Sequence, residues 1–192
     1  MNVRRMKTED LPAVSQIDLL SFSTPWPPAA FEIELDNPIS RCWVVDVDTP
    51  DATVVAAALV VWRVLDEAHI ATIAVHPDFR GQGIGKLLLQ TGMKSAYMEG
   101  ARIYHLEVRD QNQSAQKMYM GFGYEVVGRR RHYYKDTGED ALLMTLDLTR
   151  PNPVDPRLDI VPTPALAAGA SVPLPDFLME TLDEPTRNTG PE

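Results

Sequence analysis

The sequence has almost no cysteine, no long apolar run and fewer basic than acidic residues, and each shortage excludes a class of protein. Cys42 is the single cysteine in 192 residues, so no disulfide can form within the chain, and a reducing compartment, the cytoplasm, is expected. No stretch reaches the ~20 apolar residues of a membrane span, and residues 1–20 lack the apolar centre of a signal peptide. The net charge of -9 argues against general nucleic-acid binding.

The few residues that could bind a metal or act as a nucleophile show no functional pattern. Cys42 lies in the strand-like run R-C-W-V-V-D-V, which favours a buried structural thiol. The four histidines, His69, His76, His105 and His132, show no metal-ligand spacing with one another or with Cys42. The sequence therefore predicts no metal ion.

Apolar periodicity predicts a mixed α/β domain that ends near residue 150. Thr8 is expected to cap the first helix, and the strand at 103–108 should run parallel to the one before it because a whole helix separates them. Residues 54–61 are almost wholly apolar, as in a strand covered on both faces. Strands are expected at 3–6, 41–47, 54–65, 68–75, 103–108, 124–130 and 141–148; helices are expected from Thr8 to about 20, around Phe31, Ile33 and Leu35, at about 83–98, and at 112–120.

A proline-rich segment, S-F-S-T-P-W-P-P at 21–28, breaks the first helix and carries Trp26. This tryptophan could pack on a substrate or pin the loop to the core, and the sequence leaves both open.

Residues 151–192 differ in composition from the rest of the chain. They hold nine of the sixteen prolines, two basic residues and seven acidic ones, so they bury too little to offset the entropy of ordering. An extended tail is expected, with one apolar stripe at helical spacing. The stripe consists of Leu174, Phe177, Leu178 and Leu182.

The most informative stretch is residues 73–89, I-A-V-H-P-D-F-R-G-Q-G-I-G-K-L-L-L, where a strand leads into a helix through glycines. Such a loop presents backbone N–H groups at the positive end of the helix dipole and can hold a pyrophosphate. It is not a Walker A loop, and Lys86 stands where the third glycine of a dinucleotide-binding loop belongs. It fits R-x-x-G-x-G and resembles the pyrophosphate loop of the GNAT acetyltransferases. An ordinary glycine-rich turn is the plainer interpretation.

A second group of candidates lies at 105–124, H-L-E-V-R-D-Q-N-Q-S-A-Q-K-M-Y-M-G-F-G-Y. Strand alternation puts Glu107 on the face opposite Leu106 and Val108, near the carboxyl end of a central strand, where ligands gather. Asn112 can cap the next helix or bond a ligand amide, and Tyr119 follows two helical turns later. The structural alternatives are a solvated glutamate and a core tyrosine.

Several ordered motifs make a closer resemblance. L-E-V-R-x-x-N-x-x-A-x-x-x-Y at 106–119, R-x-x-Y-Y at 130–134 and G-E-D-A-L-L-M at 138–144 resemble the bacterial ribosomal-protein-alanine N-acetyltransferases, which are GNAT enzymes. The Pro25-Trp26 pair and V-L-D-E-A at 64–68 match as well. The resemblance spans residues 1–149. His132, where asparagine is common, and Gly121-Phe122 depart from the family pattern.

The resemblance implies the GNAT fold, a mixed central β-sheet flanked by helices, over a domain at 1–150, followed by a Pro-rich acidic tail at 151–192. It implies Glu107 as general base and Tyr119 as general acid, with Trp26, Tyr133 and Tyr134 lining the acceptor groove. Acetyl-CoA is the implied co-substrate. The residues implied to bind it are Ile73, Ala74 and Val75 by their backbone, Arg80, Gly81, Gln82, Gly83, Ile84, Gly85 and Lys86 at the pyrophosphate, and Asn112 at the pantetheine.

The implied activity is transfer of an acetyl group to the N-terminal amine of a protein, with the N-terminal alanine of a ribosomal protein as the expected partner. A GNAT enzyme that acts on a small amine or a lysine shares these cofactor motifs and is the nearest alternative. A non-catalytic acyl-CoA-binding module is a further alternative, which the presence of both Glu107 and Tyr119 disfavours.

Overall fold

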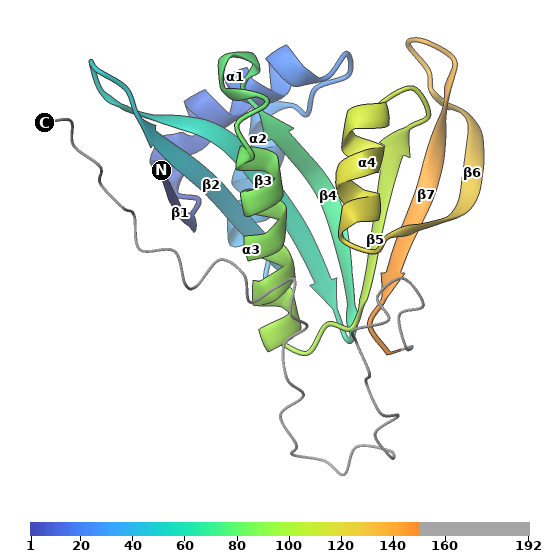
Figure 1. The fold of residues 1–192 in the computed structure, drawn as a ribbon. Helices are drawn as coiled ribbons and strands as arrows, with labels where there is room; N and C mark the ends of the chain where they lie inside the picture. Colours follow the sequence, from blue (N-terminus) through green and yellow to red (C-terminus); the bar gives the residue numbers. More distant parts are fainter. Residues whose placement is uncertain (150–192) are drawn as a thin grey trace, which may run out of the picture.

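A computed structural model describes residues 1–149 as one seven-stranded sheet with helices on both faces (Figure 1). The strand order is β1-β2-β3-β4-β5-β7-β6, and every neighbouring pair is antiparallel except β4 and β5. The strands are β1 Asn2–Arg5, β2 Ser40–Asp48, β3 Thr53–Val64, β4 Glu67–Val75, β5 Ile103–Arg109, β6 Glu125–Tyr134 and β7 Glu139–Asp147. The helices are α1 Leu11–Ser21, α2 Pro28–Asp36, α3 Ile84–Met98 and α4 Gln113–Gly121, with short 3-10 turns η1 Thr8–Asp10 and η2 Pro77–Phe79.

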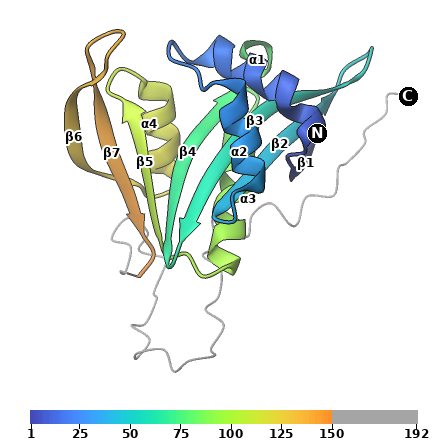
Figure 2. The same ribbon diagram turned by 180° about the vertical axis from the view of Figure 1, so that it is seen from behind.

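Two apolar clusters hold the layers together. The larger lies between the sheet and the helices α3 and α4, while the smaller lies under α1 and α2 on the opposite face (Figure 2). The buried run at 56–61 in β3 contributes to both clusters, which confirms the prediction of a strand covered on both faces. Cys42 is buried in the smaller cluster, and burial raises the pKa of its thiol to about 11, so it is a structural thiol as predicted.

One local prediction is wrong. Thr8 does not cap the first helix, because it opens the 3-10 turn η1, whose N-cap is Lys7, and Asp10 occupies the N-cap of α1. The second short helix forms around Phe31, Ile33 and Leu35 as predicted. Within it the side chain of Phe31 is buried, whereas that of Ile33 is 66% exposed.

The order of the last strands could not be read from the sequence. The two final strands do pair with each other as predicted, yet β7 lies between β5 and β6. The parallel pairing of β4 with β5 is confirmed. None of the helices within residues 1–149 combines the length and apolar character that crossing a bilayer requires. The expected tail at 151–192, with its apolar stripe, lies outside the described residues.

Candidate active site

The strands β4 and β5 separate partway along their length. Their paired segment runs from Glu67 and Ile103 to Ile70 and Leu106, whereas the strands continue to Val75 and Arg109 (Figure 1). A register shift against β3 makes Ala71 an extra residue in β4, and such a bulge bends the strand that carries it. The backbone of β4 after the bulge is thereby released from β5. Ile73, Ala74 and Val75, the predicted backbone ligands, lie in this released part.

The glycine loop leads from the end of β4 into α3, as the sequence predicts. Gly81 and Gly83 have φ of 77° and 79°, a left-handed conformation that glycine adopts without strain. Gly83 occupies the N-cap position of α3, so no side chain covers the first backbone N–H groups of this helix. Gly81, Gln82, Gly83 and Lys86 are exposed, while Ile84 is buried in the core and anchors the loop. The loop can therefore present backbone donors to an anion.

Arg80 holds the loop against two other elements. Its Nε donates a hydrogen bond of 3.0 Å to the carbonyl of Val75, and its guanidinium donates one of 3.0 Å to the hydroxyl of Ser21 at the end of α1. The arginine therefore links the end of β4, the loop and α1, in addition to offering a positive charge at the predicted pyrophosphate site.

Glu107 lies in β5 beyond the point where β4 departs, with its side chain partly exposed. Its Oε1 pairs with Arg130 of β6 at 2.7 Å. A hydrogen bond with Glu107 is the main cause that raises the pKa of Tyr133, and burial and the charge of Glu107 act in the same direction. The carboxylate is thus held by two side chains of β6 at a position that solvent can reach.

Tyr119 approaches β5 from the other side of the sheet. It comes from α4 and belongs to the larger apolar cluster together with Leu106 and Val108, whose side chains point away from Glu107. Burial raises the pKa of the Tyr119 hydroxyl well above its ordinary value, and nearby Tyr134 adds to this. The hydroxyl therefore stays protonated throughout the neutral range.

Asn112 takes the first of the two roles that the sequence left open, and its geometry is compatible with the second. Its Oδ1 accepts a hydrogen bond of 3.1 Å from the N–H of Ala115, so it caps α4. The side-chain amide nitrogen is a donor that this cap does not use. Asn112 is exposed beside the end of β5 and can offer that donor to a ligand.

Trp26 is placed as a loop anchor. Its ring lies 5.3 Å from Phe31 and 6.3 Å from Trp62, and it packs against the smaller apolar cluster. Its backbone N–H donates a 2.7 Å hydrogen bond to buried Asp18 of α1, whose pKa burial raises. Of the two interpretations of Trp26, these contacts support the one in which it pins the loop, and a role in substrate binding remains a prediction.

Arg109 is the residue of this region that sequence reasoning missed. Its guanidinium donates to Ser23 in the loop after α1 at 2.6 Å, and to Thr137, Glu139 and Asp136 of the β6–β7 hairpin at 3.0 to 3.2 Å. It also lies 3.8 Å from the ring centre of Tyr134. Its place in L-E-V-R was the available signal. However, only the folded chain brings its partners, 27 to 86 residues away in sequence, to one guanidinium.

Tyr133 and Tyr134 stand edge to face with ring centres 5.1 Å apart. Tyr133 is 40% exposed and contacts Glu107 and Arg130, whereas Tyr134 is partly buried over Arg109. The structure therefore brings Glu107, Tyr133, Tyr134 and Tyr119 to one end of β5. Trp26 lies in a separate cluster, connected to this group through the loop that Arg109 binds at Ser23.

Comparison with known proteins is consistent with this geometry. Residues 11–124 match the acetyltransferase (GNAT) family. A Bacillus subtilis protein, provisionally named a ribosomal protein bS18-alanine N-acetyltransferase, is 38% identical over 143 residues, which cover 74% of this chain and 92% of that protein. The ribosomal protein bS18-alanine N-acetyltransferase of Salmonella typhimurium is 33% identical over 146 residues, which cover 75% of this chain and 95% of that protein. The crystal structure of the Escherichia coli ribosomal-protein-S18-alanine N-acetyltransferase superposes with a TM-score of 0.68 at 29% identity. The superposition covers 80% of this chain and 97% of that protein.

Proposed function

The chain belongs to the GNAT family of acetyl-CoA-dependent N-acetyltransferases, and on that basis we propose that its acceptor is the N-terminal α-amino group of a protein. The N-terminal alanine of a ribosomal protein is the expected acceptor, because relatives that align along nearly their whole length carry that activity in their names. The observation that supports the proposal most is the carboxylate of Glu107 at the open end of β5, across the sheet from the hydroxyl of Tyr119.

Acetyl-CoA would bind where β4 and β5 separate. The backbone of Ile73, Ala74 and Val75 would pair with the pantetheine, and the side-chain amide of Asn112 would bond it from α4. The loop from Arg80 to Lys86 would hold the pyrophosphate through backbone N–H groups and two positive side chains. With these roles the thioester would lie near the end of β5.

Glu107 would remove a proton from the acceptor. An α-amino group has a pKa near ~8 and is mostly protonated at pH 7, but only the neutral amine can attack the thioester carbon. The carboxylate of Glu107 takes the proton, directly or through water, as the nitrogen–carbon bond forms. Arg130 and Tyr133 hold the carboxylate in position through this step.

Tyr119 would assist departure of the thiolate. When the tetrahedral intermediate collapses, the carbon–sulfur bond breaks and the sulfur takes up the negative charge. The buried hydroxyl of Tyr119 donates a hydrogen bond to the sulfur and passes its proton as the bond breaks. The nitrogen gives one proton to Glu107, which passes it to solvent, and a second proton leaves the nitrogen of the tetrahedral intermediate for solvent. Solvent restores the proton of the phenol, so one proton is released in each turnover. The reaction needs no covalent enzyme intermediate.

The preference for an N-terminus over a lysine has a physical basis. Deprotonating a lysine at the same pH costs about 2.4 pKa units more than deprotonating an α-amine, which corresponds to roughly 3 kcal/mol. A site that relies on a single carboxylate therefore favours the more acidic ammonium group.

The test is to incubate the enzyme with acetyl-CoA and peptides that begin with Ala, Ser, Met or acetyl-Ala, each with one internal lysine, and to locate the acetyl group by mass spectrometry. We expect acetylation of the Ala peptide at its α-nitrogen and no reaction of the acetyl-Ala peptide. Equal modification of the lysine in the blocked peptide would instead identify a lysine acetyltransferase. Turnover of small amines without any peptide product would identify a small-molecule enzyme.

A further inference from the structure

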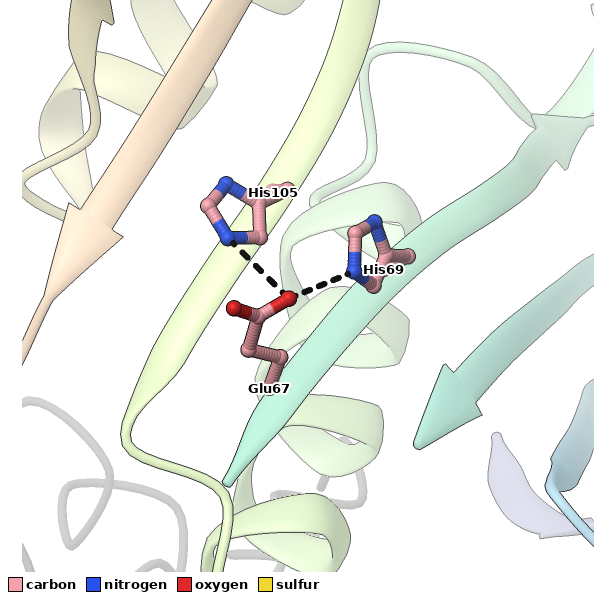
Figure 3. A group of neighbouring side chains, drawn as sticks. All are labelled: Glu67, His69 and His105. Carbon is pink, nitrogen blue, oxygen red and sulfur yellow. Dashed lines mark hydrogen bonds and ion pairs between the residues drawn. The ribbon is translucent and has the colours of Figure 1, made fainter. Parts of the chain in front are cut away.

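Two side chains of β4, Glu67 and His69, meet His105 of β5 where the two strands are still paired (Figure 3). Glu67 and His69 alternate with buried Ala68 and Ile70, so both point to the face of the sheet opposite α3 and α4. His105 lies directly opposite His69 in the parallel register, and their ring centres are 4.8 Å apart. All three side chains are partly exposed, so a small ion can reach them from solvent.

The three potential ligand atoms already lie close to the spacing of a metal site. One oxygen of Glu67 is 3.2 Å from Nε2 of His69 and 3.8 Å from Nε2 of His105, and all three ligand atoms lie within 4.8 Å of one another. Ligands about 2.0 to 2.1 Å from a tetrahedral zinc ion are about 3.3 Å apart. Small rotations of partly exposed side chains would therefore bring the three atoms onto one ion.

His105 is also held in the orientation that a ligand requires. Its Nδ1 lies 2.9 Å from the hydroxyl of Thr145, which is its partner in the register of β5 with β7. With the proton on Nδ1 donated to this hydroxyl, Nε2 presents its lone pair toward Glu67. Ligand histidines commonly have such a partner on the other ring nitrogen, which fixes the tautomer.

We propose that Glu67, His69 and His105 form a binding site for one Zn²⁺ ion, with water as the fourth ligand. Two imidazoles and one carboxylate make up a zinc ligand set, and the carboxylate offsets part of the charge of the ion. The ion would join β4 to β5 just before the strands separate at Ile70 and Leu106. It would therefore stabilise the closed end of the opening that the cofactor enters.

The experiment titrates the chelator-treated, full-length protein with ZnCl₂ by calorimetry and measures thermal unfolding with and without the metal. We expect one ion per chain, and a melting temperature that rises with Zn²⁺ concentration because the ion binds the folded state. His69→Gln and His105→Gln should each weaken binding by at least about tenfold, and Thr145→Val by about 10- to 100-fold. His76→Gln and His132→Gln, the two histidines outside the cluster, are the matched controls and should bind as the wild type does.

Circular dichroism of each variant verifies folding, and Glu67→Gln supplies a third ligand variant should a histidine variant unfold. Visible bands of four-coordinate Co²⁺ that are lost in His105→Gln would support the site. Zinc affinity and stoichiometry that are the same in the ligand variants and the controls would overturn it. An absence of both heat and thermal shift in the wild type would also overturn it, leaving the cluster as a hydrogen-bonded group with two tilted imidazole rings.

Discussion

Glu107 and Tyr119 reach the end of β5 from opposite sides of the sheet, and this difference in environment suits their different chemistry. The carboxylate is partly exposed, so it can release a proton to solvent after each turnover. The phenol is buried among apolar side chains, so its neutral form is favoured. At the scale of single residues, the two environments are those that the proposed roles require, an accessible group to accept a proton and a buried group to keep its proton until the leaving group departs.

Replacing Glu107 by glutamine should lower kcat by about 10²–10⁴-fold, because proton removal from the acceptor is lost. Binding of acetyl-CoA should be nearly unchanged, since the loop and β4 are untouched. Steady-state rates at pH 7 and calorimetric titration with acetyl-CoA measure the two effects. Glu125→Gln, at an exposed position of β6, is the control and should behave as the wild type. A Glu107→Gln enzyme with most of its turnover intact would show that another group removes the proton.

Replacing Tyr119 by phenylalanine should lower kcat by up to about 100-fold and leave acetyl-CoA affinity unchanged. Tyr124 provides a matched control, because its ring lies 5.9 Å from Tyr119 and its buried hydroxyl has no hydrogen-bond partner within residues 1–149. Tyr124→Phe should retain full activity. If the two variants behave alike, the Tyr119 hydroxyl has no role in the reaction.

The raised pKa of Tyr119 also leads to a prediction for how the wild-type kcat depends on pH. Because burial holds this pKa above the ordinary value near ~10, the phenol stays protonated at every pH below that value. The wild-type kcat should therefore show no loss from this group as pH rises to about 10, and a rate profile measured between neutral and alkaline pH tests this.

At the scale of elements, the glycine loop and the hairpin β6–β7 flank the open end of β5 in different ways. The loop offers backbone groups and depends on left-handed glycines. The hairpin offers side chains and contains an irregularity between Arg130 and Tyr134, where His132 has a φ of 51°. Histidine is among the side chains that tolerate this conformation, so His132 fits the irregularity.

Gly83→Ala should raise the Kd for acetyl-CoA about tenfold or more, because the added methyl group would lie at the loop that is proposed to hold the pyrophosphate through its backbone N–H groups. Gly100→Ala is the control, since Gly100 also has a positive φ, 106°, but ends α3 away from the loop. In both cases a Cβ meets no atom within 4 Å, so both variants should lose a similar 1–2 kcal/mol of stability, on the order expected for left-handed alanine. Calorimetry and thermal unfolding separate binding from stability. Equal cofactor affinity in the two variants would mean that the loop is only a structural turn.

Arg109→Lys should raise KM for the acceptor peptide several-fold, because one ammonium group cannot replace hydrogen bonds to four side chains and the stack on Tyr134. The Kd for acetyl-CoA should stay the same. Arg41→Lys, which breaks a comparable set of contacts to Glu99 at the other end of the molecule, should change stability and leave KM as it is. An unchanged peptide KM in Arg109→Lys would show that Arg109 supports the fold and not the acceptor groove.

At the scale of the whole molecule, the last strand that the structure describes, β7, ends at Asp147. The backbone N–H of Leu148 donates to the carbonyl of Arg102 after β7 ends, and within residues 1–149 Leu146 is the last buried member of the larger cluster, with Leu148 packed against it. The acidic segment 151–192 accounts for a net charge of -5, seven acidic against two basic residues, of the total of -9. Such a segment can attract a basic substrate, as ribosomal proteins are, in a salt-dependent way.

Deleting residues 151–192 should leave folding and acetylation of a short neutral peptide intact. For a basic full-length protein the deletion should raise KM, with the larger effect at low salt, because screening weakens attraction between charges. Rates with both substrates at two ionic strengths test this. Insoluble truncated protein would instead show that the apolar stripe from Leu174 to Leu182 is part of the core.

Local patterns predicted most of the elements because alternation, helical spacing and the placement of glycine and proline act over a few residues. The limits of α3, its terminating Gly100 and the capping Asn112 were all readable in this way. The loop and the pair Glu107 and Tyr119 were readable because motif spacing is also local. Their catalytic roles remain predictions.

The sequence by itself determined the α/β class, the family and the segments that could hold a cofactor, since each depends on neighbours along the chain. Only the tertiary structure decided the insertion of β7 between β5 and β6, the contacts of Arg109 and the meeting of His69 with His105. The physical reason is that strand pairing depends on register across the sheet. Two residues 36 positions apart can lie side by side, and no spacing rule along the chain reveals them.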